Sequence, residues 1–206
     1  MSTEEITKKA NELSLEKTAL TSAEELAVKH PLNSKWTLWY TKPPVDKSES
    51  WSDLLRPVIT FDTVEEFWAI YNSIPKASEL PVKSDYHLFK EGIKPEWEDE
   101  LNSKGGKWSF QFKKPDDIND LWTRSLLSVI GETIEEDDSD EVNGIVLNIR
   151  KGFIRIGLWT RTCDENTLLP IGEKLKKVLK LTDDMKLEFA SHQASNIRGS
   201  KPLLTV

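Results

Sequence analysis

The chain has 206 residues, which is enough for one domain with a substantial buried core. Its 37% hydrophobic and 31% charged residues are typical of a globular protein with a solvated surface. The 28 basic and 35 acidic residues give a net charge of -7. That charge argues against a protein that grips nucleic-acid backbones non-specifically, although a local basic patch remains compatible with it.

Cysteine use and apolar runs indicate the compartment. Cys163 is the only cysteine, which excludes a disulfide framework and a cysteine-based zinc site and favours a reducing compartment. No stretch approaches the roughly 20 apolar residues of a membrane span, and no signal-peptide pattern opens the chain. We therefore predict a cytosolic protein, with the nucleus as a second compartment and no membrane association.

The N-terminal residues 1–28 differ in composition from the rest of the chain. They are rich in Glu, Lys, Ser and Thr, contain no aromatic residue, and their leucines keep no helical period. We predict a disordered tail at 1–28, with a segment that folds on a partner as the alternative. The folded domain is predicted to span residues 29–206.

The first half of the domain shows short strand patterns around one helix. In chain order, the pattern predicts strand 36–41, loop 42–50 with Trp51 at its end, strand 58–61, a helix from about 62 to 74, strand 85–90, a loop that carries Trp97, and strand 107–112. A cap residue before Glu65 and Glu66 marks the helix start. Its buried stripe is predicted to be Phe67, Ile70, Tyr71 and Ile74.

The second half contains two helices and a hairpin. The pattern predicts a helix capped by Asp116 or Asp117 that ends near Gly131, strands 144–151 and 153–160 joined at Gly152, a helix at 171–181, a last strand at 186–191, and a loop to Val206. The segment from Glu132 to Glu141 holds seven carboxylates and is predicted to be a solvated loop. Seven or eight strands in mostly meander order, with helices inserted singly, predict an α+β fold: an antiparallel sheet with helices on one face.

The loop from Pro95 to Glu100 places Trp97 between the carboxylates of Glu96 and Glu98. Loops bury little, so an indole there has few structural uses. An indole face attracts a cation, and a carboxylate accepts two parallel N–H donors. The loop therefore indicates a site for a flat cation with an N–H pair on one edge. The alternative is a tryptophan packed back onto a sheet within a solvated acidic loop.

Other residues support a binding protein without establishing one. The chain has eight tryptophans, more than a core of this size requires, so we expect some of them to bind a ligand. Arg150, Lys151 and Arg155 form a basic cluster at the predicted hairpin; ordinary strand-edge cations are the alternative.

The two predicted helices also carry apolar residues outside their buried stripes. Val64 and Trp68 lie at the edge of the buried face of the first helix, and Leu127 lies opposite the buried stripe of the second. They are either half-packed or a groove for a partner helix.

Signatures of catalysis are missing. His30, His87 and His192 have no spacing typical of metal ligation, and the sequence has no glycine-rich phosphate loop and no G-x-S-x-G elbow. The acidic run after Gly131 is not the arrangement of a pyrophosphate-cleaving enzyme. We therefore predict a binding protein rather than an enzyme, with no metal and no cofactor.

Several motifs in series resemble one family. They are His30-Pro31-Leu32, Trp36-Thr37-Leu38-Trp39-Tyr40, Asp62-Thr63-Val64-Glu65-Glu66-Phe67-Trp68, Trp97-Glu98-Asp99-Glu100, Gly105-Gly106-Lys107-Trp108 and Leu126-Leu127-Ser128-Val129-Ile130-Gly131-Glu132. In this order they resemble eukaryotic translation initiation factor 4E, the family of messenger-RNA cap-binding proteins, and most closely its yeast forms. The resemblance covers about residues 29–192.

The resemblance implies a curved antiparallel sheet of about eight strands, three long helices on its convex face and the ligand on its concave face. It implies that the 7-methylguanine base is held by Trp51, Trp97, Glu98 and Trp159. It implies that the cap phosphates are held by Arg150, Arg155 and Lys107. A further phosphate-side lysine of animal relatives falls on Gly152, and Lys151 is the candidate to replace it.

The resemblance also implies a second site and a set of partners. The site for the scaffold factor 4G and the 4E-binding repressors is expected at His30, Pro31, Leu32, Val64, Trp68, Leu127 and Gly131. The expected partners are 7-methylguanosine-capped mRNA, factor 4G and those repressors, with the chain a monomer within a heteromeric complex. The alternatives are a repressor variant of the same family, a cap-handling hydrolase, and an adaptor whose pocket binds nothing.

Overall fold

The computed structural model describes residues 28–46, 48–113, 115, 117–136, 139–195 and 201–206. The chain divides into two compact units after Pro31, and the fold described below is that of the second unit, Leu32–Val206. The tail predicted at 1–28 lies outside the described residues, apart from Val28.

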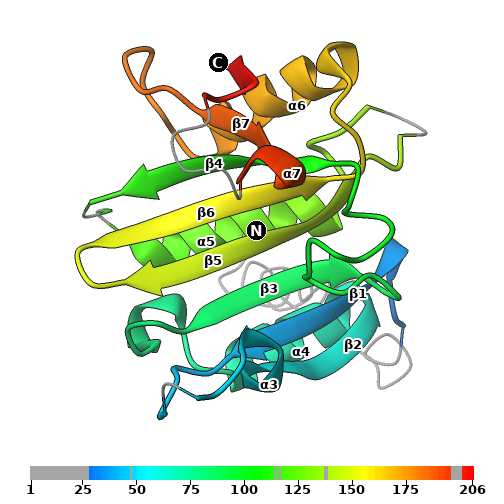
Figure 1. The fold of residues 1–206 in the computed structure, drawn as a ribbon. Coiled ribbons are helices and arrows are strands. Elements are labelled where there is room, and N and C mark those ends of the chain that lie inside the picture. Colours follow the sequence, from blue (N-terminus) through cyan, green and yellow to red (C-terminus); the bar gives the residue numbers. More distant parts are fainter. Residues whose placement is uncertain (1–27, 47, 114, 116, 137–138, 196–200) are drawn as a thin grey trace, which may run out of the picture. The chain divides into compact units, whose positions relative to one another are not determined.

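Within the described residues, eight strands form one sheet in the order β2-β1-β3-β5-β6-β4-β7-β8 (Figure 1). Their bounds are β1 Pro31–Thr41, β2 Leu55–Thr63, β3 Asp85–Lys90, β4 Gly106–Phe112, β5 Val142–Arg150, β6 Phe153–Thr160, β7 Glu188–Ser191 and β8 Leu204–Thr205. Each pairing whose register is defined is antiparallel. The predicted α+β class with a curved antiparallel sheet is therefore confirmed.

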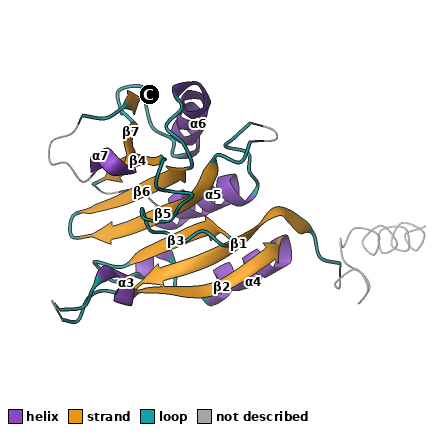
Figure 2. Cartoon of the chain, turned by 45° about the vertical axis from the view of Figure 1, so that its right-hand side comes forward, coloured by secondary structure: helices purple, strands orange, loops and turns teal. Residues whose placement is uncertain are grey.

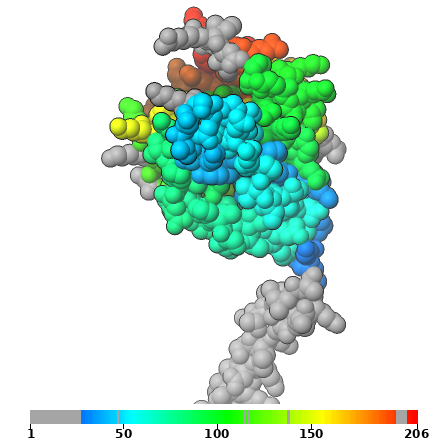
Figure 3. Space-filling view, turned by 60° about the horizontal axis from the view of Figure 1, so that its bottom comes forward, coloured from blue at the N-terminus to red at the C-terminus, as the bar shows by residue number. Residues whose placement is uncertain are grey.

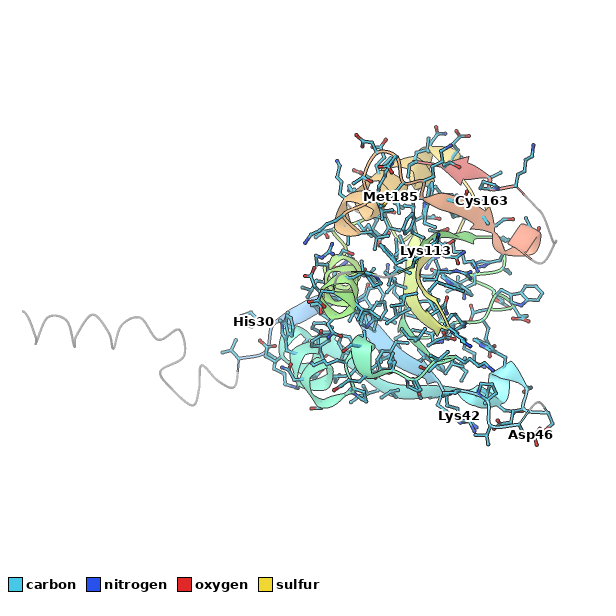
Figure 4. All side chains as sticks on the ribbon, turned by 90° about the vertical axis from the view of Figure 1, so that its left-hand side faces the viewer. His30, Lys42, Asp46, Lys113, Cys163 and Met185 are labelled. Carbon is cyan, nitrogen blue, oxygen red and sulfur yellow. The ribbon has the colours of Figure 1, made fainter. Side chains whose placement is uncertain are left out.

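The long helices are α4 (Val64–Ser73), α5 (Ile118–Ile130) and α6 (Glu165–Val178). They cover one face of the sheet, which we call the helix face (Figure 2). In side view, α4 and α5 lie on one side of the sheet, and the loop with Lys42 and Asp46 lies on the other, which we call the pocket face (Figure 4). Shorter helices are α3 (Trp51–Leu54), the 3-10 turn η1 (Ala77–Glu79) and α7 (His192–Ser195). No helix in the described part of the chain is long and apolar enough to cross a membrane.

Helix starts follow the predicted capping chemistry. The Thr63 side chain accepts a hydrogen bond from the backbone N–H of Glu66 at the start of α4, and Asp117 caps α5 in the same way. The predicted stripe of α4 packs on the core, with Phe67 fully buried. Tyr71 of this stripe also hydrogen-bonds Thr123 of α5 through its hydroxyl, at 2.5 Å, so α4 and α5 lie side by side.

The core lies between the sheet and these helices. Trp36, Leu38 and Trp108 point into it from β1 and β4, as the period-two patterns predict. Gly172 of α6 lies directly on the Trp108 indole, since a Cβ at this glycine would be 2.6 Å from Trp108 Cζ2. The absence of a side chain at Gly172 therefore lets α6 approach β4 closely.

Two local predictions were wrong near helix starts. Trp51 is not at the end of a loop but is the first residue of α3, because the N-cap residue Ser50 and Asp53 inside the helix form a reciprocal capping box. The last long helix begins at Glu165 rather than Ile171. The predicted start falls directly after Pro170, which lies inside the observed helix.

The C-terminal loop prediction was also wrong in part. Leu204 and Thr205 form β8, which pairs with β7 through Phe189 and Glu188. Leu204 and Val206 pack against the core. A two-residue strand has no readable period, so only its pairing with a distant strand defines it.

The acidic segment 132–141 is not simply a solvated loop. Glu135 is 5% exposed, and its carboxylate accepts hydrogen bonds from the backbone N–H groups of Glu141 and Val142. The amine of Lys90, at the end of β3, lies 3.4 Å from Glu135 and 2.8 Å from Asp140. A largely buried ammonium needs anionic partners, and this segment supplies them.

We expect Lys90→Met to lower the free energy of unfolding by about 1–3 kcal/mol, because Glu135 stays buried and loses its cation while keeping two backbone donors. Urea denaturation measures the effect. Lys35→Met is the control: Lys35 pairs with Asp62 at 3.4 Å across an exposed surface. Loss of that pair should cost less than about 1 kcal/mol. Equal effects of the two substitutions would contradict a structural role for the buried pair.

Candidate functional site

A pocket of about 430 Å³ opens on the pocket face. Its lining is Trp51, Asp85, His87, Pro95, Glu96, Trp97, Glu98, Lys107, Val146, Asn148, Arg150, Arg155, Gly157 and Trp159. The structure thus brings together every residue that the sequence assigned to the base and phosphate sites, apart from Lys151.

Strand alternation explains how the sheet part of the lining is built. In β6, Arg155, Gly157 and Trp159 are alternate residues and therefore share one face. Register places Lys107 of β4 opposite Trp159, and Asn148 of β5 opposite Arg155. Side chains paired across strands on one face are neighbours, so residues far apart in the sequence form one continuous floor.

Two open indoles stand at the rim. Trp51 is 44% exposed on α3, and Trp97 is 46% exposed in the loop between β3 and β4. The surface shows the segment around residue 50 (cyan) next to the segment around residue 100 (green) (Figure 3). Glu98, beside Trp97, is also exposed. Two large apolar rings left open on one pocket suit a flat ligand that would cover both.

The third indole is held firmly. Trp159 is half-buried, with the Phe89 ring 5.4 Å away edge-on and the His192 ring 4.1 Å away on α7. Burial, followed by the charge of Lys107, lowers the pKa of His192 to about 4, so this ring is neutral at neutral pH. Aromatic packing therefore fixes the orientation of Trp159 at the pocket wall.

Arg150 is oriented by a residue that the sequence analysis did not assign to the site. Its guanidinium makes two contacts with the buried Asp85 carboxylate, Nη1 to Oδ1 at 2.6 Å and Nη2 to Oδ2 at 3.2 Å. Asn148 also donates to Asp85 Oδ1, at 2.9 Å. A bidentate pair fixes the plane of an arginine, so Arg150 is presented in one direction.

Arg155 and Lys107 are cations without a carboxylate partner within the described part of the chain. Burial lowers the pKa of the Lys107 ammonium, and the charge of Arg155 lowers it further. Burial also lowers the pKa of Arg155; the charge of Arg150 adds to this, and Asp85 opposes it. Uncompensated positive charge in a partly buried site favours an anionic group of the ligand.

His87 is a second residue that the sequence analysis missed. It lies on the pocket floor, its Nε2 is 2.8 Å from Thr41 Oγ1, and its ring meets Trp51 edge-on at 6.2 Å. Burial lowers the pKa of His87 to about 4, with Asp85 opposing the shift, so the ring is neutral. Polar residues at alternate positions of strand 85–90 were the available signal, since Asp85 and His87 must share a face.

Lys151 does not line the pocket. It is exposed in the turn between β5 and β6, beside Gly152, whose φ of 100° favours glycine. Its role toward phosphate stays a prediction.

Three of the residues predicted to bind a protein partner lie on the helix face. Val64, Trp68 and Leu127 are 36%, 38% and 38% exposed on the neighbouring helices α4 and α5, and we call them the helix-face patch. Gly131 caps α5, its N–H donating to the Leu127 carbonyl. Leu32 is half-buried against the core. His30 and Pro31 belong to the N-terminal unit, which is not placed relative to this patch.

The fold and the pocket together define a class of protein: one open antiparallel sheet with α4, α5 and α6 on one face and an aromatic, cation-lined pocket on the other. Residues 31–203 match the family model described as eukaryotic initiation factor 4E. Eukaryotic translation initiation factor 4E of Candida albicans is 64% identical over 208 residues, covering 98% of this chain and 99% of that protein. The chain belongs to the eukaryotic initiation factor 4E family, as its motifs indicated.

Solved structures agree with this assignment. A complex of Caenorhabditis elegans eIF4E-3 with the 4E-binding protein Mextli and cap analog has a TM-score of 0.80 and 38% identity, covering 87% of this chain and 100% of that one. A complex of Ascaris suum eIF4E-3 with m7G cap has a TM-score of 0.79 and 39% identity, covering 87% and 98%. The family is one of translation initiation factors that bind the mRNA cap.

Proposed function

We propose that this chain binds the 7-methylguanosine cap of mRNA, with the base stacked between Trp51 and Trp97. The observation that carries the proposal is the pair of open indoles on one pocket, next to the exposed carboxylate of Glu98. The Ascaris relative solved with m7G cap supports the ligand class. In this proposal residues 29–206 are the cap-binding domain, and the protein acts in the cytosol.

Methylation of guanine N7 gives the base a delocalised positive charge. Each indole face then gains roughly 1–3 kcal/mol from stacking and roughly 0.5–2 kcal/mol from cation–π attraction. Unmethylated guanine keeps the stacking and loses the charge contribution. Discrimination between methylated and unmethylated caps therefore comes from the charge-dependent contribution.

Glu98 is assigned to the Watson–Crick edge of the base. Its carboxylate would accept hydrogen bonds from N1–H and the 2-amino group, each contributing about 1.5–3 kcal/mol because the acceptor is charged. Trp159, held in place by Phe89 and His192, would lie beside the N7-methyl group. Glu96, Asp99 and Glu100 have no ligand role in this proposal.

The cap phosphates are assigned to Arg150, Arg155 and Lys107, with Lys151 as an additional contact. We expect Arg155→Ala to weaken binding of 7-methyl-GTP by about 10- to 100-fold, because a charge-assisted hydrogen bond is worth about 1.5–3 kcal/mol. Binding of 7-methylguanosine, which has no phosphate, should change less than about twofold. Isothermal titration of both ligands measures this, and an equal loss for both would remove Arg155 from the phosphate site.

The second proposed activity is recruitment of scaffold factor 4G, and binding of 4E-binding repressors, through the helix-face patch. An amphipathic partner helix would place apolar side chains over Val64, Trp68 and Leu127. The Caenorhabditis relative solved with a 4E-binding protein supports this partner class. His30, Pro31, Leu32 and Gly131 are assigned to the same site.

We expect Trp68→Ala to reduce affinity for a 4G-derived or repressor-derived helical peptide by about 30-fold or more, as truncation of a central interface tryptophan typically costs about 2 kcal/mol or more. Fluorescence anisotropy of a labelled peptide measures this. Retention on a 7-methyl-GTP resin should be unchanged. Loss of cap retention by a folded Trp68→Ala protein would contradict the presence of two separate sites.

Retention on a 7-methyl-GTP resin with a GTP competitor tests the main proposal. Free 7-methyl-GTP should release the protein and quench its tryptophan fluorescence, while GTP should do both far less. Equal effects of the two nucleotides would contradict the cation–π argument. Release of 7-methyl-GDP from capped RNA in the presence of magnesium would instead indicate a hydrolase.

A further inference from the structure

Two fully buried asparagines lie behind the loop that carries Trp97 and Glu98. Asn102 belongs to this loop and Asn143 to β5, and both side chains are 0% exposed. Asn143 Nδ2 lies 3.0 Å from Asn102 Oδ1, so the two amides are hydrogen-bonded to each other. We call them the amide pair.

A β-bulge places Asn143 where it can reach the loop. In the pairing of β5 with β6, Val142 lies opposite Thr160 and Gly144 opposite Trp159, so Asn143 is an extra residue in β5. A bulge turns its residue out of the regular alternation. The Asn143 side chain is thereby aimed at the loop, where its Nδ2 also donates to the Leu101 carbonyl at 2.7 Å.

The amide pair holds the backbone on both sides of the ligand-facing residues. Asn102 Nδ2 donates to the carbonyls of Lys94 and Glu96, each at 2.8 Å, just before Trp97. Asn143 holds Leu101 and Asn102 just after Glu98. Asp99 closes the loop further, with its carboxylate accepting from the backbone N–H groups of Lys94 and Leu101.

Within the described residues, the side-chain hydrogen bonds of Asn143 are made by its donor nitrogen. Its Oδ1 is buried without a hydrogen-bond partner within the described residues. Both hydrogen bonds of Nδ2 run to the loop, so this side chain ties β5 to the loop. What it holds is the loop at the pocket rim.

We infer that the amide pair is a positioning device that keeps the Trp97 and Glu98 loop in its ligand-ready conformation before the ligand arrives. The inference rests on the proposed function, because it concerns the residues that hold the loop of the proposed cap site in place before the cap binds. If only a fraction of the molecules is in the binding-competent conformation, the apparent affinity and the association rate fall in proportion to that fraction. The dissociation rate of the bound state is unchanged.

Stopped-flow binding of 7-methyl-GTP to Asn143→Leu tests the inference, because leucine keeps the side-chain volume and removes the donor. We expect the association rate to fall about tenfold with a dissociation rate within about twofold of the unsubstituted protein. Asn119→Leu is the matched control: Asn119 donates to Ser78 Oγ on the helix face, and its loss should leave both rates unchanged. An unchanged association rate in Asn143→Leu, or a loss wholly in dissociation, would overturn the inference.

Asn102→Ala is the second variant. Since the two amides act as a unit, Asn143→Leu should lower the association rate by a smaller factor in an Asn102→Ala background than in the unsubstituted chain. Fully additive effects of the two substitutions on the association rate would contradict the inference that the two amides act together.

Hydrogen exchange of the unsubstituted, ligand-free protein keeps the inference testable if both variants unfold. The inference requires that Asp99, Asn102 and Ser103 amides are already protected without ligand, and that 7-methyl-GTP adds little protection. A loop that becomes protected only when ligand is added would overturn it. Protection without any binding of 7-methyl-GTP would leave the device intact and reject the proposed function, so the two failures are distinguishable.

Discussion

Replacing Trp97 with alanine is expected to weaken 7-methyl-GTP binding by about 100-fold. The variant loses one indole face, worth roughly 1–3 kcal/mol in stacking and roughly 0.5–2 kcal/mol in cation–π attraction, and about 1.4 kcal/mol corresponds to a factor of ten. Trp97 is 46% exposed in a loop and makes little contribution to the core, so the loss should appear in binding rather than in stability.

Isothermal titration calorimetry is the appropriate measurement, because the substitution removes one of the fluorophores. Trp68→Ala serves as the control, since it also removes a half-exposed tryptophan but from the helix face. Affinity of the Trp97→Ala protein within about threefold of the unsubstituted chain would contradict the stacking role, because the lower estimate for one stacked face already exceeds that change.

Replacing Glu98 with alanine should have the other large effect, a loss of about 10- to 100-fold in affinity for 7-methyl-GTP. The base would lose the charged acceptor of two N–H groups, and each such hydrogen bond contributes about 1.5–3 kcal/mol, part of which water recovers in an open pocket. Glu100→Ala is the matched control, since it removes an exposed carboxylate from the same loop.

The nucleotide 7-methyl-ITP makes this test specific, because it lacks the 2-amino group and keeps the positive charge. The unsubstituted chain should prefer 7-methyl-GTP, and the Glu98→Ala protein should bind both nucleotides almost equally. A preference that survives the substitution would assign recognition of the base edge to another residue.

Local patterns predicted most of the sheet. The period-two alternation around Trp108 and the hairpin at Gly152 matched β4, β5 and β6 closely, and the cap before Glu66 matched the start of α4. Neighbouring residues determine these features, so a sequence window contains the information. A window was insufficient for β8, because only its pairing with β7 defines a strand of two residues.

The acidic segment shows the same limit in electrostatic terms. Its composition favours solvation, yet Glu135 is buried, with the Lys90 amine 3.4 Å from its carboxylate and two backbone N–H groups donating to it. Nothing near Glu135 in the sequence indicates that amine. Charge pairing between residues this far apart depends on the sheet order, which composition does not contain.

For the pocket, the loop pattern by itself indicated Trp97 and Glu98 as candidates, with a tryptophan packed on the sheet as the alternative, and the family motifs added Trp51, Trp159 and the cations. Only the tertiary structure decided what orients them. Asp85 holds Arg150, and Asn143 reaches the Trp97 loop through a bulge. Strand register and a bulge bring these partners together, and both arise from pairing between distant strands, so no local pattern in the sequence encodes them.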